Sequence, residues 1–182
     1  MTVIIIIAVI ALLVLWVISV QRKLVNQDEL CKNAMSQIGV QLQSRWDALT
    51  ALAELIKSYN EHEYKTLRDV IAARKDITGS SNAADVEAQE DAMAKALKQI
   101  DIVVEQYPDL KSNENYAKAM DSVNVYENQV RTSRMVYNDT VTKFNKVVRQ
   151  IPDSLIAGLL GFTPKEYLKD APEKAEMPKM NV

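Results

Sequence analysis

The stretch MTVIIIIAVIALLVLWVISV, residues 1–20, contains no charged side chain, and Arg22 and Lys23 follow it at once. A helix rises ~1.5 Å per residue, so about 20 apolar residues cross the roughly 30 Å hydrocarbon core of a bilayer. We therefore predict a transmembrane anchor over residues 1–21. The side chains expected to face lipid include Val3, Ile7, Ile10, Leu13, Trp16 and Val20.

A cleaved signal peptide is the competing interpretation of this apolar run. No basic residue precedes the run and no small-x-small cleavage motif follows it, so we expect an uncleaved, single-pass anchor. The charges of Arg22 and Lys23 lie on its C-terminal side, and the positive-inside rule places such charges in the cytoplasm. This predicts a cytoplasmic location for the rest of the chain. Because the acidic Asp28 and Glu29 follow closely, the opposite orientation stays open.

The sequence beyond the anchor favours an uninterrupted helix. QRKLVNQDEL, residues 21–30, has neither glycine nor proline, so one helix is predicted from about residue 3 to residue 57. Ser58 with Glu61, and Asn60 with Glu63, each have the spacing of a capping box, which indicates a break near residues 58–62, with a continuous helix as the alternative. Apolar residues recur along this first helix at steps of three and four: Met35, Ile38, Leu42, Leu49, Leu52, Ile56 and Tyr59.

The next predicted connection is TGSSNAAD, residues 78–85. Glycine often ends a helix in the left-handed conformation, and Ser or Asn often caps the next helix. We therefore expect Gly79 to end one helix and Ser81 or Asn82 to begin the following one.

Prolines delimit the remaining helices. One helix is expected to stop before Pro108 and a long one before Pro152, since proline disfavours helical geometry in the residue before it. Amphipathic helices joined by short loops bury their apolar faces against one another. We therefore predict an all-α fold, an antiparallel bundle of three to four helices over residues 22–162. The charged, proline-containing residues 163–182 are predicted to be a disordered tail.

Charge and composition argue against several functional classes. The 22 basic and 24 acidic residues are interleaved, with a formal net charge of −2, so we expect no nucleic-acid partner. Cys31 is the only cysteine and is interpreted as an ordinary helix residue. His62 is the only histidine, whereas a metal site usually needs three or four converging ligands and nucleophilic catalysis needs a paired base. We therefore predict no metal, no cofactor and no enzymatic activity.

Several polar residues fall on or beside the apolar stripes. Helical periodicity places Glu127 and Arg134 toward the core, where an unpaired charge costs several kcal/mol. We expect them to be paired in a polar layer between helices that fixes their register. A cleft for an anionic ligand, gripped by Arg74 and Arg134, is the alternative. The residues predicted for this layer are His62, Glu63, Arg74, Glu127, Asn128 and Arg134.

The stretch IPDSLIAGLLGF, residues 151–162, has no charge after Asp153. It predicts two helical turns that are apolar nearly all round and too short to span a bilayer. One interpretation is that it covers the open end of the bundle, since such helices are normally buried. The other is an exposed apolar patch that contacts another subunit or lipid. The candidate assembly contact consists of Leu155, Ile156, Leu159, Leu160 and Phe162.

Five sequence blocks together resemble the LemA family over about residues 24–162. They are NAMSQIGVQLQSRWDAL, YNEHEYKTLRDVIAAR, EQYPDLKSNENY, YENQVRTSRMVYNDTVTKFN and IPDSLIAGLLGF, in the family's order and at compatible spacing. Gly39 stands where the family usually has an acidic residue. The resemblance implies a membrane-anchored helical bundle of bacterial origin, and magnetosome-building relatives imply a role in membrane shaping or assembly.

These observations predict a single-pass, non-enzymatic scaffold that self-associates at the bacterial cytoplasmic (inner) membrane and organises or shapes it. The expected partners are the lipid bilayer and further copies of the chain; the sequence identifies no other protein partner. The alternative is a membrane-tethered ligand-binding or signalling adaptor that uses the polar layer between helices.

Overall fold

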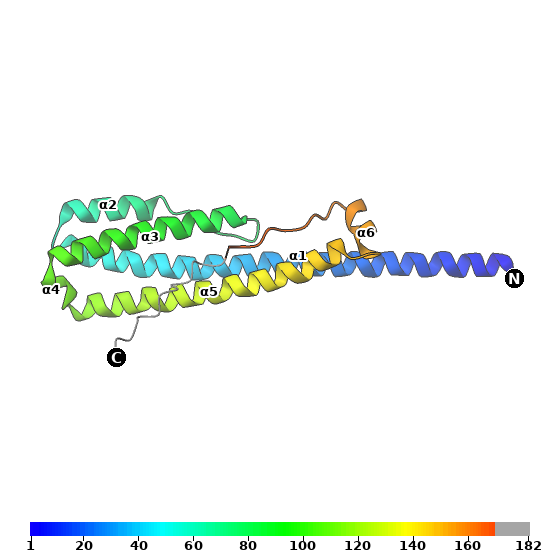
Figure 1. Cartoon of the computed structure of the whole chain (residues 1–182), viewed down its shortest axis with the longest axis horizontal. Coiled ribbons are helices and arrows are strands. Elements are labelled where there is room, and N and C mark those ends of the chain that lie inside the picture. The colour runs from blue at the N-terminus through cyan, green and yellow to red at the C-terminus, as the bar shows by residue number, and fades with distance from the viewer. Residues whose placement is uncertain (170–182) are drawn as a thin grey trace, which may run out of the picture.

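The computed structural model describes residues 1–169 of the 182-residue chain. In this part of the chain the fold is all α-helical, as predicted. Helix α1 runs the full length of the molecule, α5 lies antiparallel beside it, and the N-terminal part of α1 projects alone from the bundle (Figure 1). The helices are α1 (Thr2–Lys57), α2 (Glu61–Ala72), α3 (Ala83–Gln106), α4 (Pro108–Lys111), α5 (Glu114–Arg149) and α6 (Asp153–Leu159).

Helix α1 is continuous from the apolar N-terminal run into the bundle, as the absence of glycine and proline in residues 21–30 predicted. The predicted break after it is also confirmed. The Asn60 side chain accepts hydrogen bonds from the backbone N–H groups of His62 and Glu63, at 3.0 and 3.1 Å. This N-cap satisfies donors that have no intrahelical partner and so begins α2.

The connection between α2 and α3 differs from the prediction for Gly79. Helix α2 ends earlier, at Ala72, and Gly79 has no positive φ. Its smallness serves a close approach instead, since a Cβ there would lie 3.0 Å from the carbonyl oxygen of Lys32 on α1. A Cβ on Gly39 would lie only 2.0 Å from the carbonyl oxygen of Ile77. These two glycines let the connection lie directly on α1.

The ends of α3 and α5 agree with the sequence. Asn82 and Asp85 form a complete capping box at the start of α3. Pro108 occupies the first position of α4, where the missing N–H of proline leaves no hydrogen bond unmade. A single helical turn therefore forms between α3 and α5. Helix α5 ends at Arg149, shortly before Pro152.

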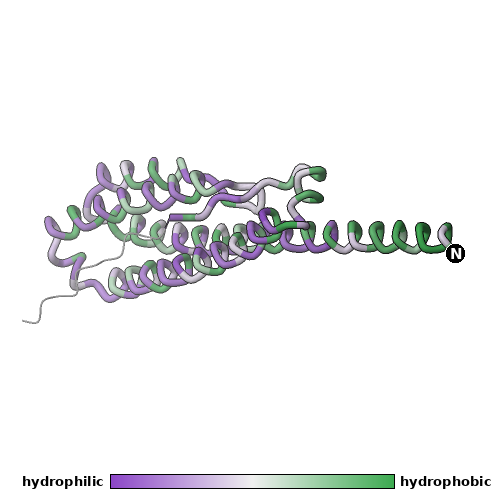
Figure 2. The backbone as a smooth tube through the Cα atoms, turned by 45° about the vertical axis from the view of Figure 1, so that its right-hand side comes forward, coloured by the Kyte–Doolittle hydropathy of each residue, from purple (hydrophilic) through white to green (hydrophobic). Residues whose placement is uncertain are grey.

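Two separate clusters of buried side chains hold the bundle together. The anchor-side cluster joins α1, α5, α6, the start of α3 and Leu168, and includes Leu24, Met35, Ile38, Leu42, Val86, Val130, Phe144 and Ile156. The distal cluster joins the five helices α1, α2, α3, α4 and α5, and it includes Trp46, Leu49, Ile56, Leu67, Met93, Ile100, Leu110 and Val123. The hydropathy colouring in Figure 2 shows the contrast with the projecting part of α1, which is apolar along its whole length.

Candidate functional site

The projecting part of α1 is long and apolar enough to cross a membrane. Of the predicted anchor residues, Val3, Ile7, Ile10 and Leu13 are exposed, Trp16 is half-buried and Val20 is buried. Residues 1–15 are therefore not part of a core helix of the described bundle, because their apolar side chains are exposed, whereas Val20 belongs to the anchor-side cluster and Trp16 packs against it. Such a surface fits a membrane anchor, where lipid covers the apolar side chains.

Helix α6 has a buried face and an exposed face. Ile156 and Ala157 are buried in the anchor-side cluster, and Phe162 packs against Phe144 with ring centroids 6.2 Å apart. Leu155, Leu159 and Leu160 are exposed, Leu159 by 83 %. One face thus covers core, as the first interpretation predicted, and the other face is exposed; its contact with another subunit or lipid stays a prediction.

Helix α6 lies beside α1 at the point where the projecting part begins (Figure 1). Lys23 Nζ and Asp153 Oδ2 form an ion pair at 3.0 Å. Trp16 packs against the anchor-side cluster, which also contains Val20 and Ile156. The folded body therefore reaches the last turns of the apolar run.

Two buried arginines form a polar layer between the two core clusters. Arg45, only 5 % exposed, contacts Glu127 at 2.9 Å and Glu90 at 3.5 Å. Arg134, 7 % exposed, lies 3.9 Å from Glu90 and donates a hydrogen bond to the carbonyl oxygen of Lys169. Burial raises the pKa of Glu90 above its ordinary value, although both arginines act in the opposite direction. The layer pairs its charges internally.

The structure brings only two of the six predicted residues, Glu127 and Arg134, to this layer. Arg74 instead pairs with Asp47 near the surface, at 3.2 Å. Glu63 accepts a hydrogen bond from Gln99. His62 and Asn128 are exposed.

Sequence reasoning missed Arg45 and Glu90, which complete the layer. The signal was present, because Arg45 lies three residues after Leu42 and Glu90 lies three before Met93, on the same helical faces. The helical periodicity that places Glu127 and Arg134 toward the core therefore places Arg45 and Glu90 there as well.

Residues 163–169, here called the strap, correct the prediction of a disordered tail. Asn145 both donates to the carbonyl oxygen of Lys165 and accepts from its N–H, at 2.9 and 2.8 Å. Asn138 does the same for Leu168, at 2.9 Å in both bonds. Leu168 is buried. The predicted tail therefore contains an ordered segment at its start; residues 170–182 lie outside the described part of the chain.

The spacing of these contacts explains why the strap fits α5. Asn138 and Asn145 stand two helical turns apart, a rise of about 10.5 Å. Lys165 and Leu168 are three residues apart, which in extended chain is about 10 Å. The two asparagines therefore meet the extended backbone in register, with the strap running antiparallel to α5.

Two lysines add charge pairing along the strap. Lys165 lies 2.9 Å from Asp28 and Lys169 lies 3.0 Å from Glu87. Burial tends to raise the pKa of Asp28, but hydrogen bonds from Lys32 and Lys165 outweigh it and lower the pKa. The hydrogen bond from Lys169 lowers the pKa of Glu87. The strap thus connects α5 to both α1 and α3.

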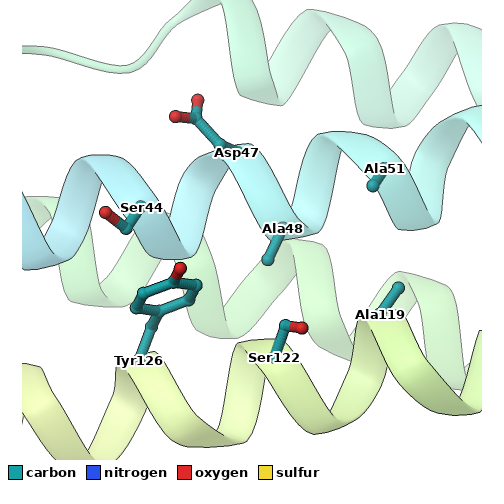
Figure 3. A pocket seen from close by; sticks show the side chains of 7 residues that line it. All are labelled: Ser44, Asp47, Ala48, Ala51, Ala119, Ser122 and Tyr126. Atoms are coloured by element: carbon teal, nitrogen blue, oxygen red, sulfur yellow. The ribbon is translucent and has the colours of Figure 1, made fainter.

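Two open hollows lie between helices in the described part of the chain. A hollow of about 280 Å³ lies between α1 and α5. Figure 3 shows its lining, with the small side chains Ala48 and Ala119 and with Asp47 pointing away from α5. A groove of about 690 Å³ lies between α2 and α3. Neither Arg74 nor Arg134 lines either of them. In residues 1–169 no group of three or more His, Cys, Asp or Glu side chains is placed to hold a metal ion.

Comparison with known proteins gives the family. The magnetosome proteins MamQ 2 and MamQ 1 of Paramagnetospirillum magneticum are each 32 % identical to the chain over 77 residues, which is 42 % of this chain. The match covers only 28 % of the length of each of these relatives. The LemA family model matches residues 34–182. Since this match covers well over half of the 182-residue chain, the chain belongs to the LemA family.

Proposed function

We propose that the chain is a membrane-anchored, non-enzymatic helical scaffold that self-associates at the bacterial cytoplasmic membrane and organises or bends the surrounding bilayer. The observation that carries this proposal is the unbroken course of α1 from the apolar run into the bundle core. Its 56 residues make a rod about 84 Å long, of which about 30 Å crosses the membrane.

A continuous α1 gives a physical basis for the scaffold. Because one helix forms both the span and the element that contacts α2, α3, α5 and α6, a tilt imposed on the bundle is passed directly to the span. Contacts between neighbouring bundles would therefore orient several spans together. LemA proteins are membrane-associated, which agrees with this placement.

The relatives supply weaker support for a role in membrane organisation. The two similar proteins carry magnetosome names, and the likeness covers a minority of either chain. By analogy, we assign this chain to the assembly of a membrane structure rather than to a reaction. The exposed Arg22 and Lys23 directly after the span support a cytoplasmic bundle through the positive-inside rule.

The adaptor alternative has less support. It required Arg74 and Arg134 to grip an anionic ligand together. Arg134 contacts Glu90 and the strap, whereas Arg74 pairs with Asp47. Both guanidinium groups are already engaged, so no shared anion site is formed by them.

Energy transfer between labelled copies in lipid vesicles tests self-association. Ser80→Cys, on the exposed connection between α2 and α3, provides a label site, while Cys31 is buried and is replaced by alanine. Donor- and acceptor-labelled chains are mixed in detergent, reconstituted, and then diluted by fusion with excess lipid. A scaffold predicts energy transfer that survives the dilution.

Monomers contradict the proposal. They would give energy transfer that falls to the level of randomly placed molecules as lipid is added. A single-pass control helix made of residues 1–30 alone, labelled at its C-terminal end, shows how much transfer the span produces without the bundle. Transfer in the full chain that matches this control would remove the bundle from the assembly.

A further inference from the structure

Several exposed apolar residues gather on and beside the short helix α6. Leu155 and Leu159 stand one helical turn apart, Leu160 follows directly, and Ile151 is exposed just before the helix. Single exposed apolar residues are normal on a protein surface, whereas a contiguous group marks a contact. The opposite face of the same helix is already buried, so the fold presents this face outward.

The height of α6 along α1 points to the kind of partner. Asp153, the first residue of α6, is bound to Lys23, which lies about 5 Å beyond the end of the uncharged run at Val20. The polar layer on each side of a bilayer's hydrocarbon core is about 5 to 8 Å deep. When α1 spans the membrane, α6 therefore lies at the level of the lipid headgroups.

Charge at this end of the bundle suits the same partner. Arg22 and Lys23 follow the span, and Lys146 and Arg149 occupy the last turn of α5; all four are exposed. Asp153 is the acidic residue of α6, and it is paired with Lys23. Exposed basic residues at the same end of the bundle as an apolar face are complementary to anionic lipid, and they would repel the same residues on a second copy.

We propose that α6 is an interfacial membrane helix, with Leu155, Leu159 and Leu160 inserted among the lipid chains beside the span. Interfacial helices bury an apolar face about 5 to 10 Å into the boundary between headgroups and acyl chains. The proposal rests on the anchoring of α1 in the proposed function. It gives the bundle two attachments to the bilayer, the span and α6, which together fix its height and its rotation about α1.

Quenching of a single tryptophan by brominated lipid tests the proposal. The native Trp16 and Trp46 are replaced by phenylalanine, and Leu159→Trp supplies the reporter in the full chain. The vesicles contain phosphatidylcholine and a minority of phosphatidylglycerol, with bromine either near the headgroup or near the chain end. We expect the reporter to lose most of its fluorescence to the shallow bromine and little to the deep bromine.

Three matched reporters make the outcome specific. Leu155→Trp places the probe at a second exposed position of α6 and should behave like Leu159→Trp. Val125→Trp, at an exposed position of α5 in the distal half, should not be quenched. Ile10→Trp lies in the middle of the apolar run and should be quenched by the deep bromine if α1 spans the membrane.

Each failure has a separate meaning. If Ile10→Trp is quenched but neither α6 reporter is, the lipid contact of α6 is wrong while the anchor stands. If Ile10→Trp is also unquenched, the anchoring in the proposed function is wrong. Unquenched, blue-shifted α6 reporters, together with an assembly that dissociates in the Leu155→Ser, Leu159→Ser, Leu160→Ser variant, would assign this face to a second copy instead.

Discussion

The half of the bundle beside the anchor and the half distal to it are closed in different ways. In the distal half, α2, α3 and α4 cover α1 and α5, and the buried residues belong to helices. In the anchor-side half, α3 has only begun, and the strap and α6 complete the cover. Arg45, Glu90 and Glu127 lie at the boundary between the two clusters.

This difference shows that an irregular segment can cover the core in place of a helix where other residues provide hydrogen-bond partners for its backbone. A helix bonds its own N–H and C=O groups, whereas an extended strap needs partners from elsewhere. Asn138 and Asn145 supply both a donor and an acceptor to the strap. Amide side chains thus pair the backbone of the covering segment in the anchor-side half, whereas helical hydrogen bonds pair it in the distal half.

The largest predicted effect comes from breaking the boundary between the halves. Arg45→Met removes the cation shared by Glu90 and Glu127 and leaves the half-buried Glu90 with only the longer contact to Arg134. We expect the free energy of unfolding to fall by about 3 kcal/mol. Urea unfolding of the full chain in detergent, followed by helical circular dichroism, measures it.

Arg74→Met is the matched control for this boundary. It breaks a partly exposed ion pair with Asp47, so its cost should stay within about 1 kcal/mol. Equal losses in the two variants would show that the buried layer contributes no more than a surface pair.

The next effect separates the anchor-side half from the distal half. Asn138→Ala and Asn145→Ala each leave a backbone N–H and C=O of the strap without a partner, at a cost of about 1 to 3 kcal/mol each. We expect faster tryptic cleavage after Lys165 and faster hydrogen exchange at Leu168, with exchange in α2 and α3 unchanged. Asn128→Ala, at an exposed position, should change neither rate, and an effect confined to the distal half would refute the role of the strap.

A third substitution tests the contact between α1 and the α2–α3 connection. In Gly39→Ala the added Cβ meets the Ile77 carbonyl oxygen at 2.0 Å, so the connection must move, at a cost of about 1 to 3 kcal/mol. Gly158→Ala introduces a Cβ with nothing within 4 Å and should leave the stability unchanged or slightly increased. Thermal unfolding of both variants provides the comparison. A Gly39→Ala variant as stable as the parent would show that the connection does not rest on α1.

The smallest predicted effect is a pH dependence with opposite signs at two glutamates. Burial raises the pKa of Glu90 in the folded state, so its contribution to stability declines as the pH rises from about 4.5 through that pKa. The stability of Glu90→Gln relative to the parent should therefore increase as the pH rises.

Glu87 provides the opposite case. Its pKa is lowered by Lys169, so its contribution is present above the ordinary pKa and is lost as the pH falls through the folded value. The stability of Glu87→Gln relative to the parent should therefore decrease as the pH rises. Unfolding curves recorded from acid to neutral pH measure both differences, and the same sign at both positions would contradict the assigned shifts.

Some of the candidate site was accessible from the sequence and some was not. The anchor residues follow from an uncharged run, and Glu127 and Arg134 follow from helical periodicity. Arg45 and Glu90 follow the same periodicity on α1 and α3, so the sequence also contains the signal for these two residues. The strap had no such signal, because its contacts join residues far apart in the sequence and its composition is typical of disordered chain.

The sequence by itself determined the apolar run long enough to span a membrane, most of the helix boundaries and the all-α class. Each depends on local chemistry: an uncharged run of membrane length, capping residues such as Asn60 and Asn82, and prolines that cannot continue a helix. The tertiary structure alone decided which charges meet in the layer, why Gly39 carries no side chain, and which face of α6 is exposed. Those outcomes depend on how closely distant segments approach, and no local pattern records that distance.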